Sequence, residues 1–354
     1  MKVIDFFSGC GGASEGLRQA GFDVVLGLDF DKDAAASYRA NFPEAEFIEG
    51  DIRQVSEHDV VKLVREKNPQ QEPLLLAACA PCQPFSRQNK FQSEDDVRRT
   101  LLDETYRFIR ELKPEYIIIE NVPGIQNVDE SKDGPYKRFL EFIQSIGYQY
   151  TSFIAKSEKY GVPQKRKRFV LIASRLGQVD IPPETHGVGL EPYKTVRDFI
   201  AQLPPIEAGV THPDDHLHVS QTLKEKNLLR IKNTPEGGDR RNWPESLVNE
   251  CHKDYTGHMD TYGRMKWDLP APTLTTKCHS YSNGRFGHPD TSQNRAITLR
   301  EASRLQTFPP NFIFNGNMGS RAKQIGNAVP CEMARQFGLW IIEHMHNNKE
   351  QING

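Results

Sequence analysis

Short apolar runs alternate with amphipathic stretches over the first half of the chain. The runs are rich in branched and aromatic residues, and apolar residues in the stretches between them recur every three or four positions. The expected strands are 3–7, 24–29, 47–48, 74–78, 116–122, 153–155 and 169–173, and the expected helices are 14–20, 34–41, 60–65, 106–112 and 139–146. This order is typical of an α/β fold with a doubly wound, mostly parallel sheet.

The pattern changes beyond about residue 180. Prolines and histidines become frequent and no apolar period is sustained until residues 299–305, which are followed later by an amphipathic stretch at 331–345. We therefore expect a second, smaller and irregular domain. The predicted division is a first domain over residues 1–183, a second over residues 184–316, and a carboxy-terminal segment, 317–354, that returns to the first domain.

Composition predicts a water-soluble globular protein. The chain has 354 residues, of which 37% are hydrophobic and 26% charged, and no apolar run approaches the roughly 18 residues that a membrane span needs. The amino terminus leads directly into a strand, so we expect a cytoplasmic protein with no membrane partner. The six cysteines are expected to be reduced thiols. A net charge of -2 argues against a protein that coats polyanions indiscriminately.

Two apolar strands end in reactive side chains. The run 74–78 leads into a loop that contains Cys82, and the run 116–119 ends in Glu120. Because neighbouring parallel strands end at the same edge of a sheet, we expect the thiol and the carboxyl to lie close together. Such a pair suits covalent attack on a ring that must also be protonated. Cys79 and Cys82 also have a redox spacing, but a loop rather than a helix follows them, which disfavours that reading.

A glycine-rich turn follows the first strand. Gly9, Gly11 and Gly12 stand where the strand meets the next helix, so backbone amides there are free to face a ligand. Asp29 ends the second strand at the position suited to both hydroxyls of a ribose, and Asp51 follows the third. These residues predict an adenosine-containing cofactor, either a dinucleotide or S-adenosylmethionine. A turn without a ligand is the alternative.

Several longer motifs follow one another along the chain. They are Asp5-x-Phe7-Ser8-Gly9-x-Gly11-Gly12, Pro81-Cys82-Gln83-Pro84-Phe85-Ser86, Glu120-Asn121-Val122, Gln164-x-Arg166-x-Arg168, Arg300-Glu301-x-x-Arg304-Leu305-Gln306-x-Phe308-Pro309 and Gln324-x-Gly326-Asn327-Ala328-Val329-Pro330. Together and in this order they resemble the motif series of the cytosine-5 DNA methyltransferases of bacterial and phage type. The resemblance covers nearly the whole chain. It implies the class I S-adenosylmethionine methyltransferase fold and displaces the dehydrogenase and redox interpretations.

The resemblance implies covalent catalysis on cytosine. Cys82 would add to carbon 6 of the ring, and Glu120 would donate a proton to nitrogen 3. Arg168, and more loosely Arg166, would hold carbonyl oxygen 2 and the flanking phosphates, since a guanidinium fork suits both. A base stacked in a duplex is out of reach, so the target cytosine would be flipped out.

The resemblance also implies where the cofactor and the DNA bind. S-adenosylmethionine, which leaves as S-adenosylhomocysteine, would lie against Phe7, Gly9, Gly11, Gly12, Asp29, Phe30, Asp51, Ile52, Pro81, Asn327 and Val329. Double-stranded DNA would contact Ser86, Arg87 and Gln88 in a closing loop, and Arg241 and Arg285 in the second domain, which would be the target-recognition domain. The segment 271–276 resembles the threonine-containing segment of that domain. No metal is expected, because the cysteine and histidine spacing matches no common zinc motif.

The predicted function is methylation of carbon 5 of cytosine in DNA at a short sequence, with a paired restriction endonuclease as a possible functional partner. Two alternatives stay open at this stage. One is a tRNA cytosine-5 methyltransferase of the same fold, against which the long region 184–298 argues. The other is a catalytically silent DNA-binding regulator, against which the intact set of Cys82, Glu120 and Arg168 argues.

Overall fold

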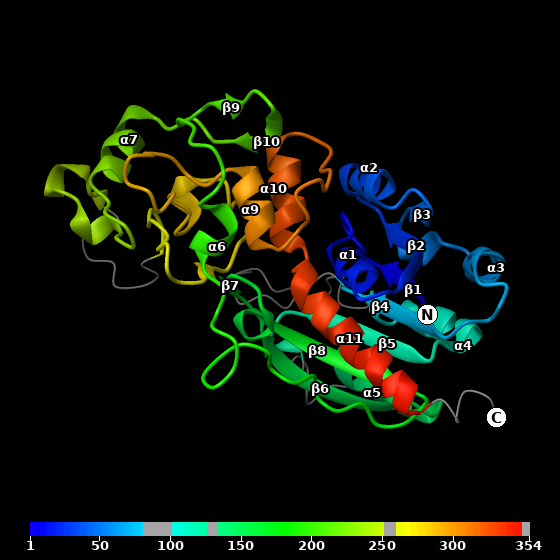
Figure 1. Ribbon diagram of the computed structural model, residues 1–354. Coiled ribbons are helices and arrows are strands. Elements are labelled where there is room, and N and C mark those ends of the chain that lie inside the picture. The colour runs from blue at the N-terminus through cyan, green and yellow to red at the C-terminus, as the bar shows by residue number, and fades with distance from the viewer. Residues whose placement is uncertain (81–100, 126–133, 251–259, 349–354) are drawn as a thin grey trace. The chain divides into compact units, whose positions relative to one another are not determined.

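The computed structural model describes residues 1–80, 101–125, 134–250 and 260–348. The chain forms two compact units, whose elements are shown in Figure 1. Unit 1 comprises the described parts of Met1–Lys156, Lys167–Glu184 and Val329–Gly354, and unit 2 those of Ser157–Arg166 and Thr185–Ala328.

Unit 1 is built on a 7-stranded sheet with the strand order β3-β2-β1-β4-β5-β8-β6. The strands are β1 (Lys2–Phe6), β2 (Asp23–Asp29), β3 (Glu46–Glu49), β4 (Leu74–Ala78), β5 (Tyr116–Asn121), β6 (Gln149–Lys156) and β8 (Lys167–Ser174). The first five pair in parallel, whereas β8 runs antiparallel between β5 and β6. The predicted mostly parallel sheet is therefore confirmed.

The helices of unit 1 alternate with these strands. They are α1 (Gly12–Gln19), α2 (Lys32–Asn41), α3 (Glu57–Lys67), α4 (Thr105–Leu112), α5 (Pro135–Ser145) and α11 (Cys331–Asn347). Local chemistry sets several starts: the Asp31 carboxylate accepts hydrogen bonds from two first-turn amides of α2, and the Ser56 hydroxyl accepts one at α3. Helix α11, near the end of the chain, packs against α1, near its beginning.

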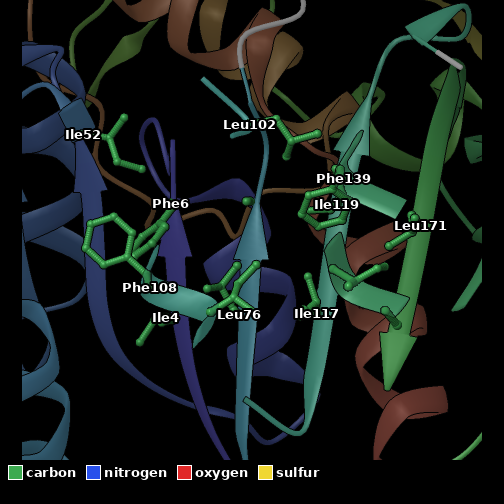
Figure 2. Packing of buried hydrophobic residues seen from close by; sticks show 14 of the residues in the cluster. Ile4, Phe6, Ile52, Leu76, Leu102, Phe108, Ile117, Ile119, Phe139 and Leu171 are labelled. Carbon is green, nitrogen blue, oxygen red and sulfur yellow. The ribbon is translucent and has the colours of Figure 1, made fainter. Parts of the chain in front are cut away.

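One hydrophobic cluster of the core lies on one face of the sheet, between the strands and the helices α4 and α5. Figure 2 shows Ile4 and Phe6 of β1, Leu76 of β4, Ile117 and Ile119 of β5, Leu171 of β8, Phe108 of α4 and Phe139 of α5 packed together. Each of them is at most 2% exposed. Complete burial of such a side chain stabilises the fold by about 1.5–3 kcal/mol. The packing fixes the strands in register, so the residues that follow the parallel strands emerge at one edge.

Unit 2 contains little regular structure. The strands and α-helices in its described residues are β7 (Gln164–Lys165), β9 (Thr211–His212), β10 (Asp215–Val219), β11 (Ala271–Pro272), α6 (Val196–Ile200), α7 (Glu225–Lys232), α9 (Leu299–Leu305) and α10 (Met318–Asn327). Buried arginines hold its loops together. Arg264 is fully buried and donates to the backbone carbonyls of Ile231, Thr234, His288, Asp290 and Gln293. Such bonds connect the end of α7 to two loops and help to satisfy carbonyl groups that are buried away from water.

The chain passes from unit 1 to unit 2 close to residue 184, but the two units differ from the predicted division in two places. Helix α10 belongs to unit 2, so the chain returns to unit 1 at Val329 and not at residue 317. Residues 157–166 also belong to unit 2, where β7 pairs with β11. Each of these two strands has only two residues. That is too short for any apolar alternation to mark them in the sequence.

Candidate active site

Two charged residues meet at the end of β5. Glu120 lies opposite Val170 in the antiparallel pairing of β5 with β8, which makes Arg168 its diagonal neighbour on the same face. The Nε atom of Arg168 is 2.5 Å from Oε1 of Glu120, and the two side chains are 13% and 14% exposed. Oε1 is buried and accepts no well-angled hydrogen bond within the described part of the chain. The contact is therefore an ion pair without a well-aligned hydrogen bond, and a donor with better geometry is able to replace Arg168 at Oε1.

Asn121 fixes the chain that leads to Cys82. Its Nδ2 donates to the carbonyl of Ala80 at 3.1 Å, its Oδ1 accepts the N–H of Val122 at 2.9 Å, and the residue is 1% exposed. Ala80 is the last described residue before the expected nucleophile, so the Asn121 amide holds the entry to that segment beside β5. The predicted site residues Pro81, Cys82, Ser86, Arg87 and Gln88 lie outside the described residues.

The glycine turn after β1 is fastened to the end of β2. The N–H of Gly9 donates to Oδ2 of Asp29 at 2.8 Å, and the N–H of Asp31 donates to Oδ1 at 2.9 Å. Burial raises the pKa of Asp29. Gly9 has a φ of 54°, and a Cβ there would meet nothing within 4 Å, so space is open beside the turn. At Gly11 a Cβ would come within 2.4 Å of the Phe42 ring, which only glycine avoids.

Other predicted cofactor residues of unit 1 lie close to the ends of the neighbouring strands β1, β2 and β3. Phe7 follows β1 with a φ of 58°, and Gly12 begins α1. Phe30 follows β2 and is 65% exposed, which leaves an aromatic face available for stacking. Beyond β3, Ile52 is buried, and a hydrogen bond from Arg53 lowers the pKa of Asp51. A ligand at Asp51 would share the carboxylate with this arginine.

The sequence marked Asp5 only as part of a motif, and the structure shows an unusual environment for it. The residue is fully buried in β1, and its Oδ2 accepts a hydrogen bond from the Ser14 hydroxyl at 2.7 Å. Burial raises the pKa of Asp5 to about 7. The Ser14 hydroxyl also lies 2.9 Å from the Tyr38 hydroxyl, so a buried polar chain supports the start of α1.

The predicted site residues of unit 2 differ in how they are engaged. Arg166 is 1% exposed and donates to the carbonyls of Leu274 and Gly326. This internal role disfavours the expected contact of Arg166 with the base, which stays a prediction. Asn327 ends α10 with an exposed side chain. Val329, the first residue back in unit 1, is buried.

The two arginines predicted to contact DNA also differ. Arg285 donates to the carbonyls of Gly237 and Gly238 and pairs with Asp239, so most of its guanidinium serves unit 2 itself. Arg241 pairs with Asp239 at 2.6 Å, yet its side chain is 68% exposed. The hydrogen bond from Arg241 is the main cause that lowers the pKa of Asp239 to about 2. Of the two, Arg241 is the more accessible to a phosphate.

Comparison with known proteins gives the family. The model described as C-5 cytosine-specific DNA methylase matches residues 1–343. The chain belongs to this family. It is accordingly a DNA (cytosine-5-)-methyltransferase, and the family predicted from the motifs is confirmed. No helix in the described part of the chain is long and apolar enough to cross a membrane.

Individual relatives agree along the whole length. The methyltransferase is 40% identical to the Type II methylase M.HgiDII of Herpetosiphon aurantiacus, with 98% of this chain and 97% of the relative covered. It is 31% identical to M.Eco47II of Escherichia coli over 96% of this chain and 78% of that one. A crystal structure of a DNA modification methyltransferase encoded in an Escherichia coli prophage superposes with a TM-score of 0.70 at 25% identity, covering 98% and 99% of the two chains.

Proposed function

We propose that the protein transfers a methyl group from S-adenosylmethionine to carbon 5 of cytosine at a short sequence in double-stranded DNA, with Cys82 as the nucleophile. The observation that supports this most directly is the Glu120–Arg168 pair at the edge of the sheet. It lies beside the chain that Asn121 holds two residues before Cys82. A carboxyl and a guanidinium that are fixed next to the entry of a cysteine loop suit nucleophilic attack on a protonatable ring.

The chemistry requires the ring to be activated, because carbon 5 of cytosine is too weak a nucleophile to take a methyl group unaided. The Cys82 thiolate forms a bond to carbon 6 while Glu120 gives a proton to nitrogen 3, and the displaced electron pair makes carbon 5 nucleophilic. After methylation, the carbon 5 proton leaves to solvent and the bond from carbon 6 to sulfur breaks. The nitrogen 3 proton then returns to Glu120.

The glycine turn and the ends of β2 and β3 fit the proposed cofactor. When bound, S-adenosylmethionine supplies an electrophilic methyl group. The Asp29 carboxylate accepts two backbone amides and still has lone pairs for ribose hydroxyls. Phe30 offers an exposed ring for the adenine, and the open space at Gly9 allows close approach to the backbone.

Similarity to Type II methylases supports duplex DNA as the substrate, and a paired restriction endonuclease as a functional partner. The target base must leave the duplex to reach Cys82, which costs a few kcal/mol of unstacking. Arg241, exposed on unit 2, is a candidate phosphate contact. Such contacts fix the register of the protein on the duplex without reading its sequence.

A mechanism-based trap tests the covalent step. Fluorine cannot leave carbon 5 as a cation, so duplex DNA with 5-fluorocytosine at the target should capture the enzyme irreversibly when S-adenosylmethionine is present. We expect an adduct that survives denaturing gel electrophoresis. Cys82→Ser should abolish it, because an alcohol is far less ionised than a thiol near neutral pH. Cys79→Ser is the matched control and should retain it.

Other outcomes would point elsewhere. Trapping that survives in Cys82→Ser but disappears in Cys79→Ser would overturn the mechanism. A protein that binds the duplex and neither forms an adduct nor methylates it would be the silent regulator. An adduct formed only with 5-fluorocytosine in tRNA would favour the tRNA methyltransferase. Bisulfite sequencing of DNA from cells that express the chain would then identify the methylated sequence.

A further inference from the structure

The guanidinium of Arg166 joins two segments of unit 2 that are far apart in the sequence. Its Nη1 donates to the Leu274 carbonyl at 2.9 Å, and its Nη2 donates to the Gly326 carbonyl at 3.0 Å. The second bond caps α10, because the last carbonyls of a helix have no partner within it and a cation there is favoured by the helix dipole. The first bond anchors Leu274, in the middle of the threonine-containing segment, residues 271–276.

Two buried glutamines complete this connection. The Gln164 side chain accepts the N–H of Leu274 at 3.0 Å and donates to Oε1 of Gln306 at 2.8 Å. Gln306 in turn donates to the carbonyl of Ile325, in the last turn of α10, at 2.6 Å. Both glutamines are fully buried. The carbonyl of Leu274 is thus held by Arg166, which binds the end of α10 directly. Its amide is held by Gln164, which is linked to the end of α10 through Gln306.

The backbones of the two segments are also in direct contact. A Cβ at Gly326 would come within 2.2 Å of the Thr275 carbonyl oxygen, so only glycine lets α10 end there. Leu274 is fully buried, whereas Thr273 before it and Asn327 after Gly326 are exposed. The anchored residues Leu274 and Gly326 are therefore internal, and one exposed neighbour follows or precedes each of them.

We infer that Arg166 is a positioning residue that couples duplex binding at residues 271–276 to cofactor binding at Asn327. The inference rests on the proposed function, which assigns these two ligands. A shift of the threonine-containing segment when DNA binds would move Leu274, and through the Arg166 fork and the Gln164–Gln306 pair it would move the end of α10. Lysine cannot replace the fork, because it is a point charge that does not span two carbonyls in a fixed geometry.

The test measures the coupling directly. S-adenosylhomocysteine, which cannot be turned over, is titrated by calorimetry into the full-length protein alone and with a saturating duplex that the wild type methylates. We expect the duplex to tighten S-adenosylhomocysteine binding by roughly 5–150-fold, the range typical of such coupling, and S-adenosylhomocysteine to tighten duplex binding by the same factor. In Arg166→Lys this factor should fall towards 1.

A second variant and a control keep the result specific. Gln306→Met removes the amide at similar volume and should also reduce the factor. Arg230→Lys changes another buried arginine of unit 2, which donates to Leu247 and Asn227 and is bonded to neither segment, and it should keep the wild-type factor. Thermal melts followed by circular dichroism identify the folded variants.

Three outcomes would overturn the inference. The first is that the duplex does not change S-adenosylhomocysteine affinity in the wild type, so that the coupling factor is 1. The second is a coupling factor that stays at the wild-type value in folded Arg166→Lys and Gln306→Met. The third is that Arg230→Lys lowers the coupling factor as much as these two variants do. The first needs no variant to fold. Failure of the proposed function would be seen separately, as a wild type that neither methylates the duplex nor is trapped by 5-fluorocytosine.

Discussion

At the scale of single residues, side chains at the strand ends act mainly by fixing the backbone. Asp29 accepts two amide hydrogens, and Asn121 binds the carbonyl that precedes the expected nucleophile segment. The Glu120–Arg168 pair is the contact with the most direct chemical use. Asp5 differs from these residues, because it is fully buried in the middle of the sheet and accepts a hydrogen bond from the Ser14 hydroxyl.

Asp5 should make stability depend on pH. Burial raises its pKa to about 7, whereas a carboxyl in an unfolded chain has a pKa near 3.9. The folded state therefore holds the Asp5 proton to higher pH than the unfolded state does. The stability that protonated Asp5 contributes is fully present below about pH 4 and is lost as the pH rises to about 7. Asp5→Asn removes this loss. We expect the variant to be more stable than the wild type at about pH 8, with the difference shrinking towards pH 4.

The measurement is urea unfolding of both proteins across this pH range. Asp180→Asn, at an exposed site in unit 1, is the matched control and should show a difference that changes little with pH. A difference for Asp5→Asn that is the same at acid and alkaline pH would contradict the assignment of the raised pKa.

At the scale of elements, glycines allow the closest helix packing. In α1, a Cβ at Gly16 would lie 2.1 Å from the Cys331 carbonyl oxygen and 2.7 Å from Cβ of Ala334, both in α11. Because a backbone carbonyl cannot rotate away as a side chain does, a methyl group there must push the two helices apart. Helix α11 follows directly from the segment that includes Val329, so this contact bears on the predicted cofactor site.

Gly16→Ala should therefore destabilise the protein although alanine favours helices. Overpacking of a tight contact costs about 1–3 kcal/mol, which exceeds the roughly 0.5–1 kcal/mol that alanine gains over glycine within a helix. Gly319→Ala in α10 is the matched control: the site is exposed and the nearest atom would lie at 3.4 Å. It should stabilise unit 2 by about 0.5–1 kcal/mol. Denaturant unfolding tests both, and equal effects would disprove the packing argument.

At the scale of the whole molecule, the division into two units leads to a prediction about which part of the chain recognises the target sequence. We expect unit 2 to carry the sequence specificity. A graft of residues 185–328 from a relative with another target should move methylation to that target. A graft of residues 185–316 should be less active, because Gln306 would then come from the relative and α10, whose end it binds, from this protein.

Bisulfite sequencing of DNA from cells that express each chimera measures this outcome. An active 185–328 chimera that keeps the original target would refute the assignment of specificity to unit 2. Equal activity of both chimeras would show that the contact of Gln306 with Ile325 does not matter for assembly.

The sequence by itself determined the α/β class, the mostly parallel sheet and the family. Apolar periodicity reports which residues of each element are buried, and motifs keep their residue types at fixed spacing. Tertiary structure decided the rest. The antiparallel β8 that places Arg168 beside Glu120, the membership of α10 in unit 2, and the carbonyl partners of Arg166 and Arg264 all depend on contacts between distant segments. A buried arginine cannot be told from an exposed one in the sequence, because only the fold determines which backbone carbonyls need a side-chain donor.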